Sequence, residues 1–580
     1  MQRTTDPVTR EIVKNALMST ADTMALTVVR TARSAVIKHG MDFSTALFTA
    51  DGKQVAQGLT LPAHLGAMEP ALKGVMDAFG QDIKPEDIFA NNDPYEGGSH
   101  LPDIFLFKPV FAYDTLIGWS SCIGHQTDIG GRVAGGNACD NTEIYQEGLL
   151  LPPLKLFEEG RLNQAVWRIL EKNVRVPDKV LGDVQALIAA VKFGERDLLR
   201  IGGEYGLEDL KSYMEDILDT TEKLTRSELS SLPQGEWEFS DYIDNDGIDP
   251  EPIEIRVKAR IENDEMFVDF SGTSPQARGS INPNFAYTKS QVYAAMKCMI
   301  DPSVQSNNGF FRPFTITAPE GCFVNPQHPA PVAARGLAGF RICHAIFGAM
   351  AQALPGKVPA AWGGGEVGLS FGGYYPNRKA WVYLEFNNDG PRGGGPYIDG
   401  ADGLAAPIHN MANTPIESIE ADQPLMIEQY ALVPDSGGAG TYRGGLGIVR
   451  DFRILADEAV FQLRSDRHDY LPWGVEGGKP GTPTQNYLNP DSENRELPSK
   501  HLMTLKKGDL YRCVQAGGGG YGEPLDREID SVLEDYKQEK LTRAYAQQEY
   551  GVVINPKSGD VDLQATASLR RKMKKEHLTK

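Results

Sequence analysis

Two apolar runs separated by a short turn constrain the fold of this chain most strongly. Residues 104–111 and 116–123 are each of strand length, and the stretch between them contains Tyr113 and Asp114. Runs of this length joined by a short turn predict an antiparallel strand pair. If the turn is centred between Tyr113 and Asp114, Asp103 is expected opposite Gly124, and Pro102 opposite His125.

Nitrogen and oxygen donors stand at the open end of this strand pair. His100 and Asp103 precede the first run and His125 follows the second. Opposed side chains of an antiparallel pair lie about 4.5–5.5 Å apart at Cβ, so the two halves should meet. On a straight strand His100 and Asp103 would point to opposite faces, and Pro102 is expected to bend them together. Two histidines and a carboxylate predict a divalent-metal centre.

Further donors are less tightly placed by the sequence. Asp128 faces His100 in the assumed register, and Glu147 follows some twenty residues after His125, but spacing alone establishes neither as a ligand. Glu143 has the same standing. His39 and His64 are alternatives ranked below the main set. Asp42 stands at the start of a predicted strand, 42–48, and could reach the centre only through tertiary folding.

The remaining pattern predicts an α+β, multidomain chain. Asp6 should cap an opening helix that extends to about residue 38, Asp51-Gly52 should close a hairpin, and further helices are expected over 65–79, 163–232, 287–300 and 339–354. Alternating residues from 253 to 261 predict a half-buried strand. We expect an N-terminal α+β metal-site domain (1–160), a helical subdomain (161–235), a β-rich domain with glycine-rich loops (236–525) and a C-terminal helix and tail (526–580).

Composition excludes several classes of function. A formal charge of −20 and a pI near 5.1 argue against a nucleic-acid binder, and the basic run 570–575 is interpreted as a solvated C-terminal helix or tail. The six cysteines form no Cys-x-x-Cys pair, so neither a zinc knuckle nor a disulfide framework is indicated. Without an apolar signal core or a run of about 18 apolar residues, a cytoplasmic protein that binds no membrane is expected.

Two familiar strings lack their structural context, and a third is absent. Gly517-x-Gly519-x-x-Gly522 matches a dinucleotide fingerprint, but Pro524 follows at once and no βαβ unit surrounds it. The stretch 368–372 matches a nucleophile elbow around Ser370 without a following helix. No Gly-x-x-x-x-Gly-Lys-[Ser/Thr] occurs, so a P-loop ATP site is not predicted in this chain.

Taken together, the motifs resemble those of the hydantoinase B/oxoprolinase family over nearly the full length. The residues that carry the resemblance are Met41-Asp42-Phe43-Ser44, Asn92-Asp93-Pro94-Tyr95, Gly98-Ser99-His100-Leu101-Pro102-Asp103, Gly124-His125, Glu147-Gly148, Pro152-Pro153, Asp269-Phe270-Ser271-Gly272-Thr273, Gly517-Gly518-Gly519-Gly520-Tyr521-Gly522 and Pro524-Leu525. Each motif alone is weak, whereas the set is specific.

The resemblance implies the β subunit of an ATP-dependent cyclic-amide hydrolase. An ATPase-like α subunit, carrying ATP and Mg²⁺, would phosphorylate a hydantoin, 5-oxoproline or lactam such as caprolactam, and the two would form an α2β2 heterotetramer. The β subunit would then complete ring opening at a divalent metal, with Asp42, His100, Asp103 and His125 as ligands and Zn²⁺ favoured over Mn²⁺. The compact length favours these hydrolases, caprolactamases first, over the ketone carboxylases. A noncatalytic scaffold with a structural metal is a further alternative.

Overall fold

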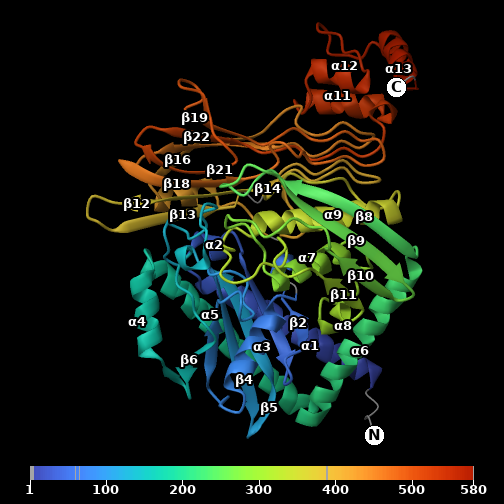
Figure 1. Ribbon diagram of the computed structural model, residues 1–580. Helices are drawn as coiled ribbons and strands as arrows, with labels where there is room; N and C mark the ends of the chain where they lie inside the picture. The colour runs from blue at the N-terminus through green and yellow to red at the C-terminus, as the bar shows by residue number, and fades with distance from the viewer. Residues whose placement is uncertain (1–5, 59–60, 65, 387–388, 410, 579–580) are drawn as a thin grey trace.

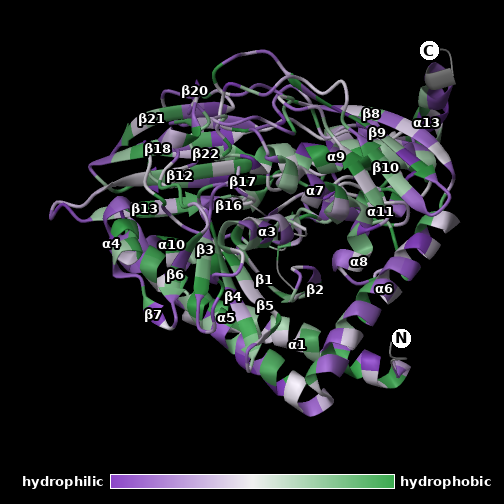
Figure 2. Ribbon diagram, turned by 60° about the horizontal axis from the view of Figure 1, so that its bottom comes forward, coloured by the Kyte–Doolittle hydropathy of each residue, from purple (hydrophilic) through white to green (hydrophobic). Residues whose placement is uncertain are grey.

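The computed structural model describes residues 6–578 apart from 59–60, 65, 387–388 and 410. The architecture is mixed α+β, as predicted, with an N-terminal sheet and its helices, a middle sheet, and stacked C-terminal sheets (Figure 1). Within these residues, no helix combines the length and apolar character needed to cross a membrane. Hydrophilic and hydrophobic residues alternate along the outer helix α6 (Leu207–Ser231) (Figure 2).

A seven-stranded antiparallel sheet forms the N-terminal part, in the order β2-β1-β5-β4-β3-β6-β7. Its strands are β1 Phe43–Thr49, β2 Gln54–Gln57, β3 Ile88–Asn91, β4 Asp103–Ala112, β5 Thr115–His125, β6 Leu154–Glu158 and β7 Arg161–Leu162. Helices α1 (Pro7–Thr31) and α5 (Pro177–Tyr205) share one hydrophobic cluster with Leu106 and Cys122 of the sheet. Helix α3 (Met68–Phe79) shares another with Phe105 and Phe107. Successive side chains point to opposite faces, and both faces are covered, which explains the continuous apolar runs.

The predicted strand pair is present, but its register differs by one residue. Near the turn Phe111 faces Leu116, whereas beyond a bulge between Val110 and Phe111 the pairing shifts. Asp103 therefore faces His125 directly, and the expected pairs Asp103 with Gly124 and Pro102 with His125 are wrong. A bulge places two residues against one, and the apolar pattern alone contains no signal for its position.

The opening helix is interrupted, contrary to the prediction of one helix to about residue 38. Asp6 caps α1 as expected, through a 2.8 Å bond from the Thr9 amide. The chain then leaves the helix, and the buried carboxylate of Asp183 accepts bonds from the amides of Arg33 and Ser34. The Ser34 hydroxyl caps a second, short helix α2 (Ala35–Lys38).

The other expected elements are largely confirmed. The helical stretch consists of α4 (Gln164–Asn173), α5 and α6, and residues 68–79 form α3, while Leu65 lies outside the described residues. The alternating stretch is β9, whose even and odd positions differ in burial as predicted. The C-terminal segment departs from the prediction of one helix and a tail over 526–580. It forms three helices, α11 (Ile529–Lys537), α12 (Arg543–Tyr550) and α13 (Leu563–Leu578), and the last carries the basic run.

The middle sheet supports the wall of the site. It has the order β11-β10-β9-β8, and helix α9 packs on β8 and β9 in one hydrophobic cluster. The elements of this part are β8 Gly235–Ile243, β9 Ile253–Glu262, β10 Glu265–Asp269, α7 Phe285–Lys297, α8 Asn308–Phe311, β11 Phe314–Thr317 and α9 Gly336–Ala353.

Two further sheets stack face to face in the C-terminal part, where Phe371 and Phe461 of one meet Phe452 and Tyr511 of the other. One sheet has the order β13-β12-β18-β21 and the other β16-β17-β22-β19-β20. The bounds are β12 Val367–Tyr374, β13 Ala380–Glu385, β14 Asp389–Gly390, β15 Leu404–Ala405, α10 Ile416–Asp422, β16 Leu425–Leu432, β17 Ile448–Ile454, β18 Glu458–Ser465, β19 Gln485–Leu488, β20 Arg495–Glu496, β21 Lys500–Lys506 and β22 Leu510–Val514.

Glycine-rich stretches outside the strands pack into what we term the glycine bundle, residues 391–400, 436–447, 472–482 and 516–522. The innermost stretch, 516–522, exchanges backbone hydrogen bonds with stretches that include Gly394, Gly445 and Lys479. Figure 1 shows these stretches running roughly alongside one another between the sheets and α11 and α12. The Gly517-x-Gly519-x-x-Gly522 string is therefore a packing element, because its peptide groups form hydrogen bonds with neighbouring backbone.

A half-buried histidine in the C-terminal part, His468, makes stability depend on pH. The Nε2 atom of His468 lies 3.0 Å from the Ser465 hydroxyl and accepts a 3.2 Å bond from the Asn486 amide, and burial lowers its pKa to about 4. Below pH 6.5, the ordinary pKa of histidine, His468 is protonated in the unfolded chain. In the folded chain it stays neutral until the pH approaches 4. Stability from this group is present above pH 6.5 and is lost as the pH falls toward 4.

We expect His468→Asn to flatten this acid dependence. Between pH 7.5 and 4.5 the wild type should lose about 2–3 kcal/mol more free energy of unfolding than the variant, by linkage from the pKa shift. Urea denaturation at both pH values, with a chelator present to exclude metal effects, measures the difference. Parallel pH dependence in the two proteins would show that His468 does not titrate as stated.

Candidate metal centre

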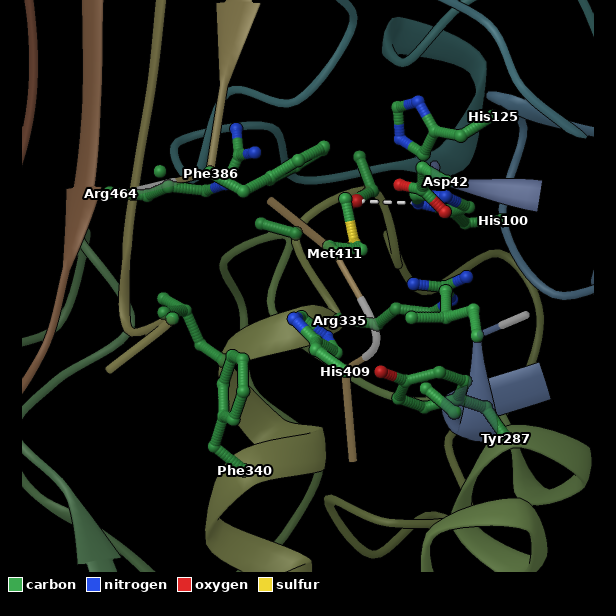
Figure 3. Close-up of a pocket in the computed structure, with 18 of the residues that line it drawn as sticks. Asp42, His100, His125, Tyr287, Arg335, Phe340, Phe386, His409, Met411 and Arg464 are labelled. Carbon is green, nitrogen blue, oxygen red and sulfur yellow. Dashed lines mark hydrogen bonds between the residues drawn. The ribbon is translucent and has the colours of Figure 1, made fainter. Parts of the chain in front are cut away.

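Three neighbouring strands bring the predicted donors to one end of the N-terminal sheet. Asp103 is the first residue of β4, His125 is the last of β5, and the two are direct partners. Asp42 immediately precedes β1, and its carbonyl accepts a 3.0 Å bond from the His125 amide. Figure 3 shows Asp42, His100 and His125 grouped on one side of a cavity.

His100 reaches the centre through a turn, and not through a strand bent at Pro102 as predicted. The Asp103 amide donates a 3.0 Å bond to the His100 carbonyl, so residues 100–103 reverse direction before β4 begins. The turn puts both side chains on one side, with His100 Nε2 3.3 Å from Asp103 Oδ1. The imidazole rings of His100 and His125 lie 5.0 Å apart between centroids.

The geometry and chemistry of these three residues fit a metal ion. One potential ligand atom from each of His100, Asp103 and His125 lies within 4.8 Å of the others, and all three side chains are buried. His100 Nε2, Asp103 Oδ1 and both ring nitrogens of His125 have no hydrogen-bond partner. Buried polar atoms in this state are costly, and a cation would satisfy them. The group could therefore bind a divalent metal.

The protonation states of His100 and His125 also favour metal binding. Burial lowers the pKa of His100 and lowers that of His125 still further, which keeps both imidazoles neutral, the form that binds metals. His100 Nδ1 lies 2.7 Å from the Ala333 carbonyl oxygen, a distance that makes Nδ1 the donor and leaves Nε2 with a free lone pair. The backbone at Ala333 thus sets both the tautomer and the orientation of the ring.

Asp103 uses its second oxygen to bind Arg335, a residue that the sequence reasoning missed. The Arg335 guanidinium forms a buried ion pair with Asp103 Oδ2, donates a 2.6 Å bond to Ser99 Oγ, and lies over the Tyr287 ring. Burial alone would raise the pKa of Asp103, but the positive charge of Arg335 holds it well below its usual range. Asp103 is thereby kept ionised and fixed in orientation.

Asp42 lines the same cavity but is not part of the close group of three. Burial, followed by the negative charge of Asp103, raises the pKa of Asp42 to about 8. A cation beside it would offset both effects. Its role as a fourth ligand stays a prediction.

Two of the three further carboxylates noted in the sequence, Asp128 and Glu147, have structural partners. Asp128 accepts bonds from the Gly130, Gly135 and Arg175 amides and pairs with the Arg175 side chain at 2.9 Å. Glu147 Oε1 accepts bonds from Ser280 Oγ and from the amides of Val332 and Ala333, at 2.7–2.9 Å. Glu147 thereby fixes the backbone of Ala333, the residue whose carbonyl contacts His100, although Glu147 itself does not line the cavity.

The cavity beside the donors measures about 50 Å³, room for an ion and one or two water molecules. His64, ranked low from the sequence, lines it, with Nε2 3.8 Å from Asp103 Oδ2, whereas His39 is not among the lining residues. The wall also includes His409, Met411, Phe386 and Arg464, which were not predicted. These residues lie hundreds of positions from the donors in the sequence. Only the presence of histidine or arginine in the glycine-rich half could have suggested His409 and Arg464.

Known proteins are similar to this chain over most of its length. The chain belongs to the hydantoinase B/oxoprolinase family, whose model matches residues 6–524. The B subunit of a provisionally named D-/L-hydantoinase from Pseudomonas sp. strain NS671 is 33% identical over 98% of both chains.

Solved structures share the fold. The beta subunit of the caprolactamase from Pseudomonas jessenii is 31% identical over 98% of this chain and 99% of its own length. A chain in the crystal structure of the ATP-dependent caprolactamase from that organism superposes with a TM-score of 0.91, covering 98% of this chain and 100% of that one, at 30% identity. A chain of acetone carboxylase in its nucleotide-free structure gives 0.90 at 20% identity, covering 99% and 84%, which shows a common fold.

Proposed function

We propose that this chain is the β subunit of an ATP-dependent amidohydrolase that opens a cyclic amide at a divalent-metal centre held by His100, Asp103, His125 and Asp42. The observation that carries the proposal is the set of buried ligand atoms on the first three residues that lack hydrogen-bond partners. Nitrogen and oxygen donors favour Zn²⁺, with Mn²⁺ as the alternative.

The chemistry of a ring amide explains why such a centre would be needed. An unstrained amide is a poor electrophile because attack on its carbonyl destroys the C–N resonance. A divalent ion in this position supplies Lewis-acid polarisation and activation of water at neutral pH. The chain's own residues orient the donors and exclude water: Ala333 fixes the His100 ring, Arg335 fixes the Asp103 carboxylate, and the buried wall keeps out bulk water. The small cavity means that lining side chains must move for a ring to bind.

A partner subunit would supply the ATP chemistry. This chain has no P-loop string, and two of its relatives are named as the B or beta component of a larger enzyme. We propose an ATPase-like α subunit that phosphorylates the substrate with Mg²⁺-ATP, in an α2β2 heterotetramer. Among cyclic amides, a lactam such as caprolactam is the first substrate to test, with hydantoins and 5-oxoproline next.

Metal content and ATP-dependent ring opening by the coexpressed pair test the proposal together. His100→Ala and His125→Ala should each lose the metal and reduce lactam hydrolysis by at least about 10²-fold, because a ligand at the reacting centre is removed. His501→Ala, on β21 and outside the cavity, is the matched control and should retain both. Metal analysis of the purified complexes and product formation give the two readouts.

Other results would point elsewhere. Full metal and activity in both variants would disprove the site assignment. Incorporation of labelled bicarbonate into a ketone substrate would identify a carboxylase. Metal retention without turnover or binding of any cyclic amide would indicate a structural centre in a noncatalytic scaffold.

A further inference from the structure

Arg464, on β18, is a buried arginine without a carboxylate partner. Its exposed fraction is 4%, yet among the residues that the structure describes no ion pair involves it. The other buried arginines of this part of the chain each pair with an aspartate or glutamate: Arg335, Arg341, Arg443, Arg450, Arg467 and Arg527. The contrast singles out Arg464, because burying an unpaired guanidinium is costly.

The neighbours of Arg464 do not neutralise its charge. Its Nη1 donates a 3.2 Å bond to Gln462 Oε1, and burial lowers its pKa to about 10, so the side chain remains charged at neutral pH. The guanidinium also lies over the Phe386 ring, 5.0 Å from its centroid. An amide oxygen and an aromatic face leave most of the five N–H donors of arginine available.

The backbone is shaped to admit this side chain. Arg464 faces Gly368 on the adjacent strand β12, and a Cβ atom at residue 368 would lie 2.5 Å from Arg464 Nε. Any larger residue there would displace the guanidinium. Both residues line the cavity of the candidate metal centre.

Arg464 lies across that cavity from the donors. Phe386 contacts both sides, since its ring is 5.2 Å from the His125 ring as well as next to Arg464. Figure 3 places Arg464 and Phe386 on one side and Asp42, His100 and His125 on the other. A ligand between them would meet the metal donors at one end and a positive charge at the other.

We propose that Arg464 binds a phosphate-type oxyanion in this cavity, either the phosphoryl group of an activated substrate or inorganic phosphate. The planar guanidinium matches the geometry of phosphate oxygens and can bind two of them at once. The choice of phosphate rests on the proposed function, in which ATP activates the ring, whereas the unpaired charge itself is independent of that function. The anion would neutralise the only buried arginine of the described chain that lacks a carboxylate.

Calorimetric titration with inorganic phosphate tests the proposal on the purified complex. Arg464→Met should weaken phosphate binding about ten- to a hundredfold, the value of hydrogen bonds to a charged group. Arg453→Met, on β17 with its own partner Glu428, is the matched control and should bind as the wild type does. Sulfate should compete, and acetate should compete weakly.

Stability and turnover distinguish the roles of Arg464. A residue kept for anion binding can be replaced without loss of Tm, so Arg464→Met should melt at the wild-type temperature or above, with normal metal content. A lower kcat for a neutral lactam would assign the phosphoryl group of the activated substrate; loss of phosphate inhibition alone would assign the released product.

Two outcomes would overturn the proposal: unchanged phosphate affinity in Arg464→Met, or a defect confined to substrates that carry a carboxylate. Because the titration needs no turnover, it remains decisive even if the complex opens no ring. Conversely, lactam hydrolysis with an Arg464-independent phosphate site would overturn only this inference.

Discussion

Replacing Asp103 by alanine is expected to remove the bound metal and to lower the free energy of unfolding by about 3–5 kcal/mol, the cost of breaking a buried ion pair from one side. The change removes one donor from the group of three. It also leaves the buried Arg335 guanidinium, whose exposed fraction is 6%, without its carboxylate partner. Metal analysis and urea denaturation of the same preparation measure the two effects.

The double variant Asp103→Ala/Arg335→Met separates them. Removing both partners should restore much of the lost stability, because no unpaired charge remains, while the metal stays absent. Asp128→Ala is the control, since it deletes another fully buried, arginine-paired carboxylate; it should destabilise the protein but retain the metal. Metal at wild-type level in Asp103→Ala would contradict the assignment of Asp103 as a ligand.

Local pattern was enough to place the central donors. The apolar runs predicted β4 and β5, and the ends of these strands carry Asp103 and His125. Register within the sheet was not predictable, because the bulge after Val110 is selected by how the twisted strands pack and leaves no mark on hydrophobic alternation. The turn at residues 100–103 was not predictable for a related reason: Pro102 is compatible with both a bent strand and a chain reversal.

The far wall of the cavity depends on tertiary contacts that no local pattern encodes. Arg335 reaches Asp103 across more than two hundred residues, and Arg464 is brought in by pairing between β12 and β18. A sequence shows that an arginine exists but not that its charge will be buried without a partner. Gly368 belongs to the nucleophile-elbow string in the sequence. Its role, which is to leave room for the Arg464 guanidinium, depends on the pairing of β12 with β18.

The sequence predicts glycine-rich loops in the β-rich domain, and the glycine bundle shows why glycine is needed there. Gly444 and Gly518 touch so closely that a Cβ on the first would overlap the carbonyl oxygen of the second. Backbone hydrogen bonds between the stretches replace the side-chain packing of an ordinary core. Glycine content therefore reports close backbone approach here, and not only freedom of turns.

Gly517→Ala should consequently be among the most damaging single changes in the protein, with a loss of about 3 kcal/mol or more in the free energy of unfolding. A Cβ at residue 517 would overlap the carbonyl oxygen of Ser436, which belongs to another backbone stretch and cannot rotate away. Gly203→Ala, inside helix α5 with no atom within 4 Å of the new Cβ, is the matched control. It should be neutral or stabilise by about 0.5–1 kcal/mol.

Chemical denaturation of both variants decides between packing and ligand binding for this string. If Gly517 and its neighbours served a dinucleotide, alanine would weaken nucleotide binding and leave the unfolding transition nearly unchanged. Packing predicts the reverse: a large fall in the transition midpoint and no titratable NAD(H) or NADP(H) affinity in the wild type. A Gly517→Ala protein as stable as Gly203→Ala would show that the backbone stretches can separate without cost, and close packing of the glycine bundle would then not contribute to stability.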